Sequence, residues 1–367
     1  MSIFLDFDGT ITTEDTVRHL ADFALGLQAE RNGTDSSPDS KTNHFSVNTQ
    51  VSPSSQSPDD AERVAEDLPT KWKGVVKAYL SEYSSHCTTY HTPTHHRTTT
   101  HSEITFQRSQ KDVELRSLDR INGCKIFHNI SPYEFKAGGR DLVERGVVRV
   151  RKGFREWIEE RQKEGWKIGV VSVNWSKDFI EGVLEGSGVK TRSAREGQGV
   201  DGESKSVVVY ANVVDEDGRV IGPDILNEGD HADRSGDEDV DDTGKRRNLT
   251  NSKDKLDVFR RAAQRNGGGR TVYFGDSTTD MECLLEADWG VVMADGEDSK
   301  LIETLRRIGE GVPRARGYDN TQRAINGDRN GNGKLGGRSE GDSRLVWAAS
   351  FEEVGEFVRF EMGKSGR

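Results

Sequence analysis

The sequence is poor in cysteine, has no long apolar run and carries an excess of acidic residues. Its three cysteines, Cys87, Cys124 and Cys283, include no Cys-x-x-Cys pair, which indicates a reducing compartment rather than a disulfide framework. No segment is long and apolar enough to cross a membrane, and the formal net charge of −11 argues against a nucleic-acid-binding surface. We therefore expect a cytoplasmic protein without membrane or nucleic-acid partners, although nothing in the sequence separates the cytoplasm from the nucleus.

The apolar share of 32% is low for a fully packed chain, and 40 glycines are many. Two segments rich in Ser, Asn, Thr or His, residues 30–60 and 84–110, are predicted to be unpacked low-complexity insertions. The six His and Cys side chains between residues 86 and 101 match no tight tetrahedral metal spacing. An acidic stretch at 228–250 and a Gly/Arg/Asn-rich stretch at 313–342 are predicted to be irregular loops.

A short acidic motif at the N-terminus carries the most information. Residues Asp6–Thr10 read Asp-Phe-Asp-Gly-Thr and directly follow the apolar run Ile3–Leu5. Asp6 and Asp8 are two residues apart, so both can face one reaction centre where a strand turns into a loop. A carboxylate nucleophile beside a second acid suits phosphoryl transfer through an aspartyl-phosphate. The alternative is an ordinary Asp-Gly turn that closes a strand.

A second segment of this kind lies downstream. The apolar run Lys167–Val171 predicts a strand that ends at Ser172 and Asn174. Apolar residues at helical spacing follow at Phe179, Ile180, Val183 and Leu184. A strand, a hydroxyl group and a helix N-terminus in this order form an arrangement that favours anion binding.

Two further segments complete the set. Lys255 opens a helical pattern, although Lys253 is a close rival for the same role. Residues 271–275 are a short β-branched and aromatic run that leads into Asp276, Ser277 and Asp280. In sheets of alternating strands and helices, ligands bind at the carboxyl ends of the strands, and these motifs fall there.

Taken in order, these motifs resemble the haloacid dehalogenase (HAD) superfamily of phosphatases, from Ser2 to about Met293. The pattern Ala211-Asn212…Asp217-Gly218…Gly222 is similar to the hairpin of the phosphoserine-phosphatase-like branch. The Ser-Val-Asn-Trp-Ser run at 172–176 is similar to a small fungal group that includes cold tolerance proteins.

The alternation of strands and helices predicts an α/β fold, and the resemblance makes it a Rossmann-like core with a mostly parallel sheet. The core would comprise residues 1–12 and 150–367. Residues 13–149, which include both low-complexity insertions, would form a helical cap inserted after the first motif. The motif must directly follow the first strand, so we expect no cleaved signal before it.

The resemblance also implies roles for the site residues. Asp6 would be the nucleophile and Asp8 the general acid and base, while Ser277 and Asp280 would orient the lysine or a metal-bound water. Mg²⁺, a hard cation that prefers oxygen ligands, would be held by the Asp6 carboxylate, the Asp8 carbonyl and Asp276. The groups expected to hold the phosphate are Thr10, Ser172, Asn174 and Lys255.

The expected partner is a small phosphorylated metabolite, and the oligomeric state is not predicted. In similar phosphoserine phosphatases, the position of Asp15 is a glutamate that receives the substrate ammonium. Asp15 is one methylene shorter, so we expect phosphoserine to be a poor substrate compared with a sugar, polyol or enol phosphate. Asp15 also has a structural reading, as a first-turn acid favoured by the helix dipole. Two other functions stay open, a phosphomutase and a non-catalytic HAD-fold protein that regulates or binds partners.

Overall fold

The computed structural model describes residues 1–31, 58–192, 206–228, 246–316 and 344–362, and gives no side-chain detail for 58–67, 356 and 358–362. Seven parallel strands form one sheet in the order β3-β4-β2-β1-β7-β8-β9. Their bounds are β1 Ser2–Leu5, β2 Lys167–Val171, β3 Thr191–Arg192, β4 Val207–Tyr210, β7 Thr271–Gly275, β8 Trp289–Met293 and β9 Leu345–Ala348. The predicted α/β fold with a mostly parallel sheet is confirmed.

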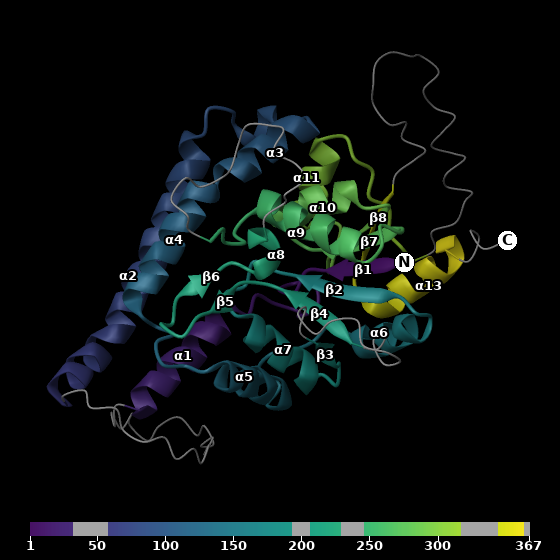
Figure 1. Ribbon diagram of the computed structural model, residues 1–367. Coiled ribbons are helices and arrows are strands. Elements are labelled where there is room, and N and C mark those ends of the chain that lie inside the picture. Colours follow the sequence, from purple (N-terminus) through teal and green to yellow (C-terminus); the bar gives the residue numbers. More distant parts are fainter. Residues whose placement is uncertain (32–57, 193–205, 229–245, 317–343, 363–367) are drawn as a thin grey trace.

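Helices cover both faces of this sheet (Figure 1). One face packs on α6 Phe154–Lys163, α7 Lys177–Gly186 and α13 Phe351–Met362. The other face packs on α9 Ser252–Arg265, α10 Met281–Glu286 and α11 Lys300–Arg307. Because both faces are covered, the central strands are mainly apolar, and all four residues of β1 are buried.

The remaining helices come from the region between the first two motifs, apart from the short α8 Asp224–Asn227. They are α1 Val17–Arg31, α2 Pro58–Thr89, α3 Thr100–Ser109, α4 Lys111–Cys124 and α5 Pro132–Glu144. A small antiparallel hairpin, β5 Val213–Val214 and β6 Val220–Ile221, lies at the predicted Ala-Asn…Asp-Gly…Gly pattern. No helix among the described residues has the length and apolar character needed to span a membrane.

The last helix of the expected cap region packs closely on the core. A Cβ atom at Gly182 in α7 would lie 2.1 Å from the carbonyl oxygen of Lys136 in α5. A Cβ atom at Gly139 in α5 would lie 2.4 Å from the carbonyl oxygen of Phe179. These glycines let α5 and α7 approach backbone to backbone. Helix α5 therefore packs directly on α7, and the division into core and cap remains a prediction.

The prediction that residues 84–110 are unpacked is wrong. They contain the end of α2, the 3₁₀ turn Thr94–His96 and helix α3. The buried Arg97 donates to Glu103 at 2.8 Å, and its guanidinium carbon lies 3.7 Å from the ring centre of Phe106. Arg307 of α11 donates to the same Glu103 carboxylate at 2.8 Å. Composition missed this segment because ion pairs and aromatic stacking, rather than aliphatic side chains, hold it.

The other segments with biased composition lie largely outside the described residues, although the ends of one of them belong to helices. Of residues 30–60, 32–57 lie outside the described residues, and the remainder belongs to α1 and α2. Most of the acidic stretch and most of 313–342 lie outside them as well. Leu249, at the end of the acidic stretch, is fully buried.

Replacing Arg97 with Met is expected to lower the free energy of unfolding by roughly 3 kcal/mol, because it leaves a buried carboxylate with one cation fewer. Arg307 still pairs with Glu103 in this variant, so the decrease in the free energy of unfolding should lie at the lower end of the range for a broken buried ion pair. Urea unfolding measures it. Arg116→Met is the matched control, since its pair with Glu82 is solvent-exposed and contributes less than about 1 kcal/mol. Equal losses for both variants would show that the buried cluster adds nothing.

Candidate active site

The sheet register brings the motifs to one edge. Leu5, the last residue of β1, pairs with Val170 of β2 on one side and with Phe274 of β7 on the other. The strands are parallel, so the residues that follow them meet at the same edge. Asp6, Ser172 and Asp276 all lie within two residues of these ends.

The loop after β1 is held from two sides. Gly9 has φ +72°, and a Cβ atom there would lie 2.2 Å from a carboxylate oxygen of Asp276. Glycine is therefore required both by the backbone conformation and by the close approach of the carboxylate. The largely buried Arg151 donates to the Gly9 carbonyl at 2.7 Å and pairs with Asp295 at 2.7 Å. Arg151 is a positioning residue that sequence reasoning missed, because nothing in its local pattern indicates this long-range contact.

A buried lysine lies at the centre of the acidic residues. Lys255 Nζ is 2.8 Å from Asp6 Oδ1 and 2.6 Å from Asp280 Oδ1, and its side chain is fully buried. Lys253, the rival in the sequence, pairs instead with Asp257 at 2.7 Å. Of the two lysines, Lys255 is therefore the one beside Asp6, and its contact with phosphate remains a prediction.

Asp280 is fixed from several directions. Its Oδ1 accepts a hydrogen bond from the Tyr273 hydroxyl at 2.9 Å, and its Oδ2 accepts one from Ser277 Oγ at 3.0 Å. Ser277 and Asp280 form a capping box at the start of the 3₁₀ turn Thr278–Asp280. Asp280 thus acts both in the local cap and as the partner of Lys255. Tyr273 was not predicted, since an aromatic residue within a strand looks like ordinary core.

The carboxylates carry more negative charge than the lysine balances. Ligand oxygens of Asp6, Asp276 and Asp280 all lie within 4.8 Å of one another. Burial raises the pKa of Asp6 well above its ordinary value, and the charge of Asp280 raises it further. Burial and the Asp280 charge likewise raise the pKa of Asp276 to about 7. Burial lowers the pKa of Lys255, but Asp280 and Asp6 outweigh it and hold the pKa above its ordinary value.

Asp8 is held apart from this cluster by donors of its own. The backbone N–H of Thr16 donates to Asp8 Oδ1 at 2.7 Å, and the Thr16 hydroxyl donates to the same oxygen at 2.6 Å. The amide of Asn174 donates to Asp8 Oδ2 at 2.9 Å. Burial and the charge of Asp15 raise the pKa of Asp8 to about 6, against the effect of these donors. Sequence reasoning missed Thr16, whose position after Asp15 reads as part of an ordinary helix start.

Two residues expected to hold phosphate have other partners here. Thr10 donates to Asp276 at 3.0 Å, and Asn174 donates to Asp8 as described. The hydroxyl oxygen of the buried Ser172 accepts a hydrogen bond from the Asn174 N–H at 3.1 Å, which leaves its own proton free to be donated. Phosphate contacts by Thr10 and Asn174 therefore remain predictions, and the structure gives both a role in placing carboxylates.

Asn212, from the predicted hairpin pattern, ties the surrounding loops together. Its amide nitrogen donates to the carbonyls of Asn174 at 3.2 Å and Leu249 at 2.9 Å. Its oxygen accepts from the Leu249 N–H at 2.9 Å. A Cβ atom at Gly222 would lie 1.7 Å from the carbonyl oxygen of Arg247, so this glycine allows the next segment to pass. The pattern is thus a structural support beside the site.

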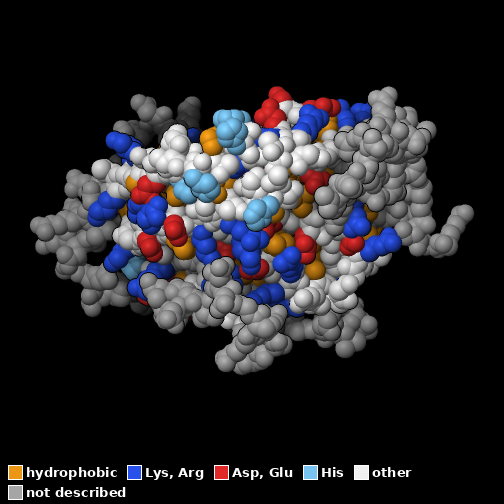
Figure 2. Space-filling model, turned by 90° about the horizontal axis from the view of Figure 1, so that it is seen from above, with side chains coloured by type: hydrophobic (Ala, Val, Ile, Leu, Met, Phe, Trp, Pro, Cys, Tyr) orange, Lys and Arg blue, Asp and Glu red, His pale blue; other side chains and the backbone are white. Residues whose placement is uncertain are grey.

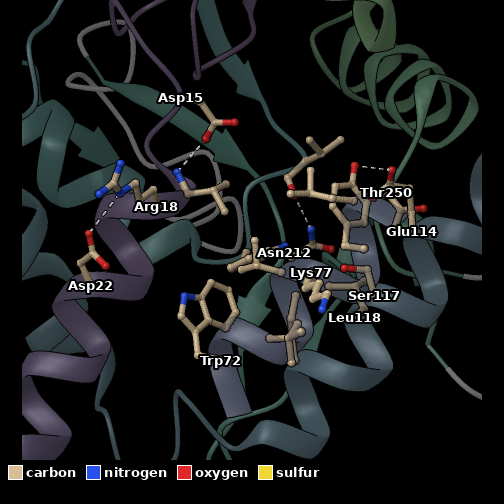
Figure 3. Close-up of a pocket in the computed structure, with 18 of the residues that line it drawn as sticks. Asp15, Arg18, Asp22, Trp72, Lys77, Glu114, Ser117, Leu118, Asn212 and Thr250 are labelled. Atoms are coloured by element: carbon tan, nitrogen blue, oxygen red, sulfur yellow. Dashed lines mark hydrogen bonds and ion pairs between the residues drawn. The ribbon is translucent and has the colours of Figure 1, made fainter. Parts of the chain in front are cut away.

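A cavity of about 1070 Å³ lies next to these loops (Figure 3). Residues of α1, α2 and α4 line it together with Glu14, Asp15, Val173, Trp175 and the segment around Leu249. Asp15 accepts a hydrogen bond from the Val17 N–H at 2.8 Å, the role of a helix-start acid. Asp15 also borders the cavity, so it can act as a helix-start acid, as a residue that faces the substrate, or as both.

Among the described residues, Asp6, Asp276 and Asp280 are the one group of three or more His, Cys, Asp or Glu side chains close enough to share an ion. No side chain of the histidine-rich segment belongs to this group. On the face shown in Figure 2, histidine side chains form separate patches that are divided mainly by uncharged surface.

Comparison with known proteins returns the groups that the motifs resemble. No protein-family model matches the chain. Cold tolerance protein 1 of Saccharomyces cerevisiae is 32% identical over 83 residues, which are 22% of this chain. The match spans 26% of that protein, about a quarter of its length.

Among solved structures, a substrate-bound phosphoserine phosphatase complex matches with a TM-score of 0.38 at 11% identity, covering 84% of this chain and 90% of that chain. A phospho-aspartyl intermediate analogue of phosphoserine phosphatase matches with a TM-score of 0.37 at 11% identity over the same shares. A Bordetella pertussis Tohama I protein with unknown function has a TM-score of 0.36 at 12% identity, covering 83% of this chain and 95% of its own. At similarity this low, function has to be argued from the site itself.

Proposed function

We propose that this protein is a Mg²⁺-dependent phosphatase of the HAD type that hydrolyses an organophosphate monoester through an aspartyl-phosphate on Asp6. One observation carries the proposal: a buried aspartate at a strand end lies 2.8 Å from a buried lysine, beside a second aspartate held by separate donors. An ordinary Asp-Gly turn needs neither the buried lysine nor the donors on Asp8.

The residues present fit a divalent cation. Asp6, Asp276 and Asp280 bring three carboxylates together, whereas Lys255 supplies only one positive charge. Burial and this surplus of negative charge raise the pKa values of Asp6 and Asp276. Their donor atoms are all oxygens, which suits Mg²⁺. Asp6, Asp276 and the backbone carbonyl of Asp8 would hold the ion. Once bound, it would offset the repulsion between the attacking carboxylate and the phosphate.

The chain's own residues would carry the two chemical steps. In the first, an Asp6 oxygen forms a bond to phosphorus as the ester P–O bond breaks, and Asp8 gives its proton to the departing alkoxide. In the second, Asp8 takes a proton from the water that attacks phosphorus, which releases inorganic phosphate and restores Asp6. A pKa of about 6 allows Asp8 to hold a proton and to give it up near neutral pH.

Lys255 and Ser172 would stabilise the charge on the transferred phosphoryl group. The Lys255 ammonium already lies against Asp6, so it is placed beside any group bonded to that carboxylate. Asp280 and Tyr273 keep the lysine chain in this position without taking part in bond making. Such preorganised charges are worth several kcal/mol in a transition state.

Removal of divalent metal is expected to abolish phosphate release from an aryl phosphate, and Mg²⁺ is expected to restore it. The expectation follows from the surplus of carboxylates around one lysine. The measurement is phosphate release after EDTA treatment and after addition of Mg²⁺. Full activity in EDTA would contradict the metal assignment. No release under any condition would favour a non-catalytic protein, and transfer of phosphate to a product without release would favour a phosphomutase.

Phosphoserine is expected to be a poor substrate, at least about tenfold below the best phosphate in kcat/KM, a difference of about 1.4 kcal/mol. Asp15 is short for an ammonium contact, and its carboxylate already accepts from the Val17 N–H. Asp15→Glu is the informative variant, because the longer side chain should raise the relative rate with phosphoserine. If phosphoserine is the best substrate of the unaltered protein, this reading of Asp15 is wrong.

A further inference from the structure

The cavity adjoins the two chain segments that hold Asp8. Asp8, the proposed proton donor to that alcohol, is held by Thr16 and Asn174. The chain neighbours of both residues line the cavity: Asp15 and Val17 on one side, Val173 and Trp175 on the other. A substrate with its phosphate at Asp6 and its ester oxygen at Asp8 would therefore extend its alcohol portion into this cavity.

The walls of the cavity are mainly apolar. Trp72 of α2 faces Trp175 edge to face, with ring centres 5.9 Å apart. The aliphatic lining residues include Val17, Val75, Val76, Leu80, Leu118, Ile121, Val173 and Leu249. Among the described residues, three large hydrophobic side chains are exposed, and two of them, Val76 and Leu80, belong to this lining. Exposed apolar side chains gathered at one hollow indicate an apolar ligand.

Most polar groups in the cavity are already engaged within the protein. The Thr250 hydroxyl donates to Asp254 at 3.0 Å, and the Tyr79 hydroxyl donates to Glu114 at 3.0 Å. Asn212 holds the loops through backbone contacts. Figure 3 shows the Arg18–Asp22 pair on the far side of the cavity from Leu118 and Ser117. A sugar or polyol would find these groups occupied, which leaves Glu14, Lys73, Lys77 and Ser117 as its polar neighbours, and any hydroxyl placed against the apolar wall would cost free energy.

We propose that the substrate is a phosphate monoester whose alcohol carries an extended apolar group, which lies in the cavity between α2, α4 and the Val173–Trp175 loop. This deepens the proposed phosphatase function and rests on it. The bonds made and broken are those given above: the ester P–O bond breaks, and the apolar alcohol leaves with the proton from Asp8. The cavity volume of about 1070 Å³ is larger than a phosphorylated amino acid requires and can hold a larger substrate.

The test compares ethyl, butyl, hexyl and octyl phosphate as substrates, each below its micelle-forming concentration. Burial of one methylene group corresponds to a factor of about four at most, so kcat/KM should rise roughly twofold to fourfold per added methylene. Octylphosphonate, which cannot be hydrolysed, should bind and alter tryptophan fluorescence through Trp72 and Trp175. Ethylphosphonate should bind far more weakly.

A matched pair of variants localises the effect. Leu80→Glu places a charge in the cavity and should flatten the dependence of kcat/KM on chain length. Tyr133→Glu is the control, because Tyr133 is exposed to 66% against 59% for Leu80 but lies on α5 outside the cavity. It should leave the dependence on chain length intact.

The two proposals fail in different ways. Hydrolysis of the whole series without dependence on chain length would overturn the apolar substrate and leave the phosphatase standing. Binding of octylphosphonate that Leu80→Glu weakens, with no hydrolysis of any ester, would support an apolar phosphate ligand and overturn the phosphatase. Neither hydrolysis nor binding would overturn both.

Discussion

Replacing Asp6 with Asn is expected to abolish phosphatase activity while leaving the protein folded. The amide is a poor nucleophile, so the loss should reach at least about 10³-fold in kcat, or about 4 kcal/mol of barrier. The substitution keeps the shape of the side chain and removes a buried charge that Asp280 repels. The metal-free variant should therefore unfold no earlier than the unaltered protein. Phosphate release and thermal unfolding in EDTA measure the two effects.

The same substitution at Asp141 provides the control. Asp141 is a partly exposed acid that pairs with Arg145 on the surface of α5, far from the catalytic loop in sequence. Asp141→Asn should change neither activity nor stability beyond about 0.5 kcal/mol. An Asp6→Asn protein that keeps a tenth or more of the activity would remove Asp6 from its proposed role.

Replacing Lys255 with Met is expected to impair both stability and activity. The ammonium is fully buried between Asp6 and Asp280, so its removal leaves two buried carboxylates without their cation. Breaking such a pair costs about 3 to 5 kcal/mol. Activity should fall as well, because the lysine no longer stabilises the transferred phosphoryl group. Urea unfolding of the metal-free protein and phosphate release of the Mg²⁺-loaded protein separate the two losses.

Lys253→Met is the matched control, two residues earlier on the same helix. Lys253 pairs with Asp257 and is about one-third exposed, so its loss should cost within about 1 kcal/mol and leave activity unchanged. Equal effects of the two variants would mean that the selection of Lys255 is wrong.

The central site was predictable because its residues follow strands of one parallel sheet. Asp6 and Asp276 each come directly after a short apolar run, and parallel strands present such residues at one edge. The choice of the phosphate-binding lysine could be narrowed to Lys253 and Lys255, because both lie at the start of a predicted helix. Which lysine is buried depends on the rotation of α9 against the sheet, and a sequence pattern with two lysines in one turn does not fix that rotation.

Other features depend on contacts between distant segments. Arg151 reaches the Gly9 carbonyl from a part of the chain with no motif of its own. The packing of residues 84–110 depends on Arg97 meeting Glu103 and, from a distant helix, Arg307. A composition rich in Thr and His predicts an open segment unless these ion pairs are known. The cavity likewise arises where α2 and α4 meet two loops, so no single segment indicates it.

The most direct test of the account is rapid acid quenching of the Mg²⁺-loaded protein during turnover of an aryl phosphate, followed by mass spectrometry of its peptides. The account predicts one phosphoryl group on the N-terminal peptide, located at Asp6, absent from the Asp6→Asn protein and lost by hydrolysis as free phosphate appears. Steady phosphate release without any phosphoryl group on Asp6, or with the group on another residue, would contradict it.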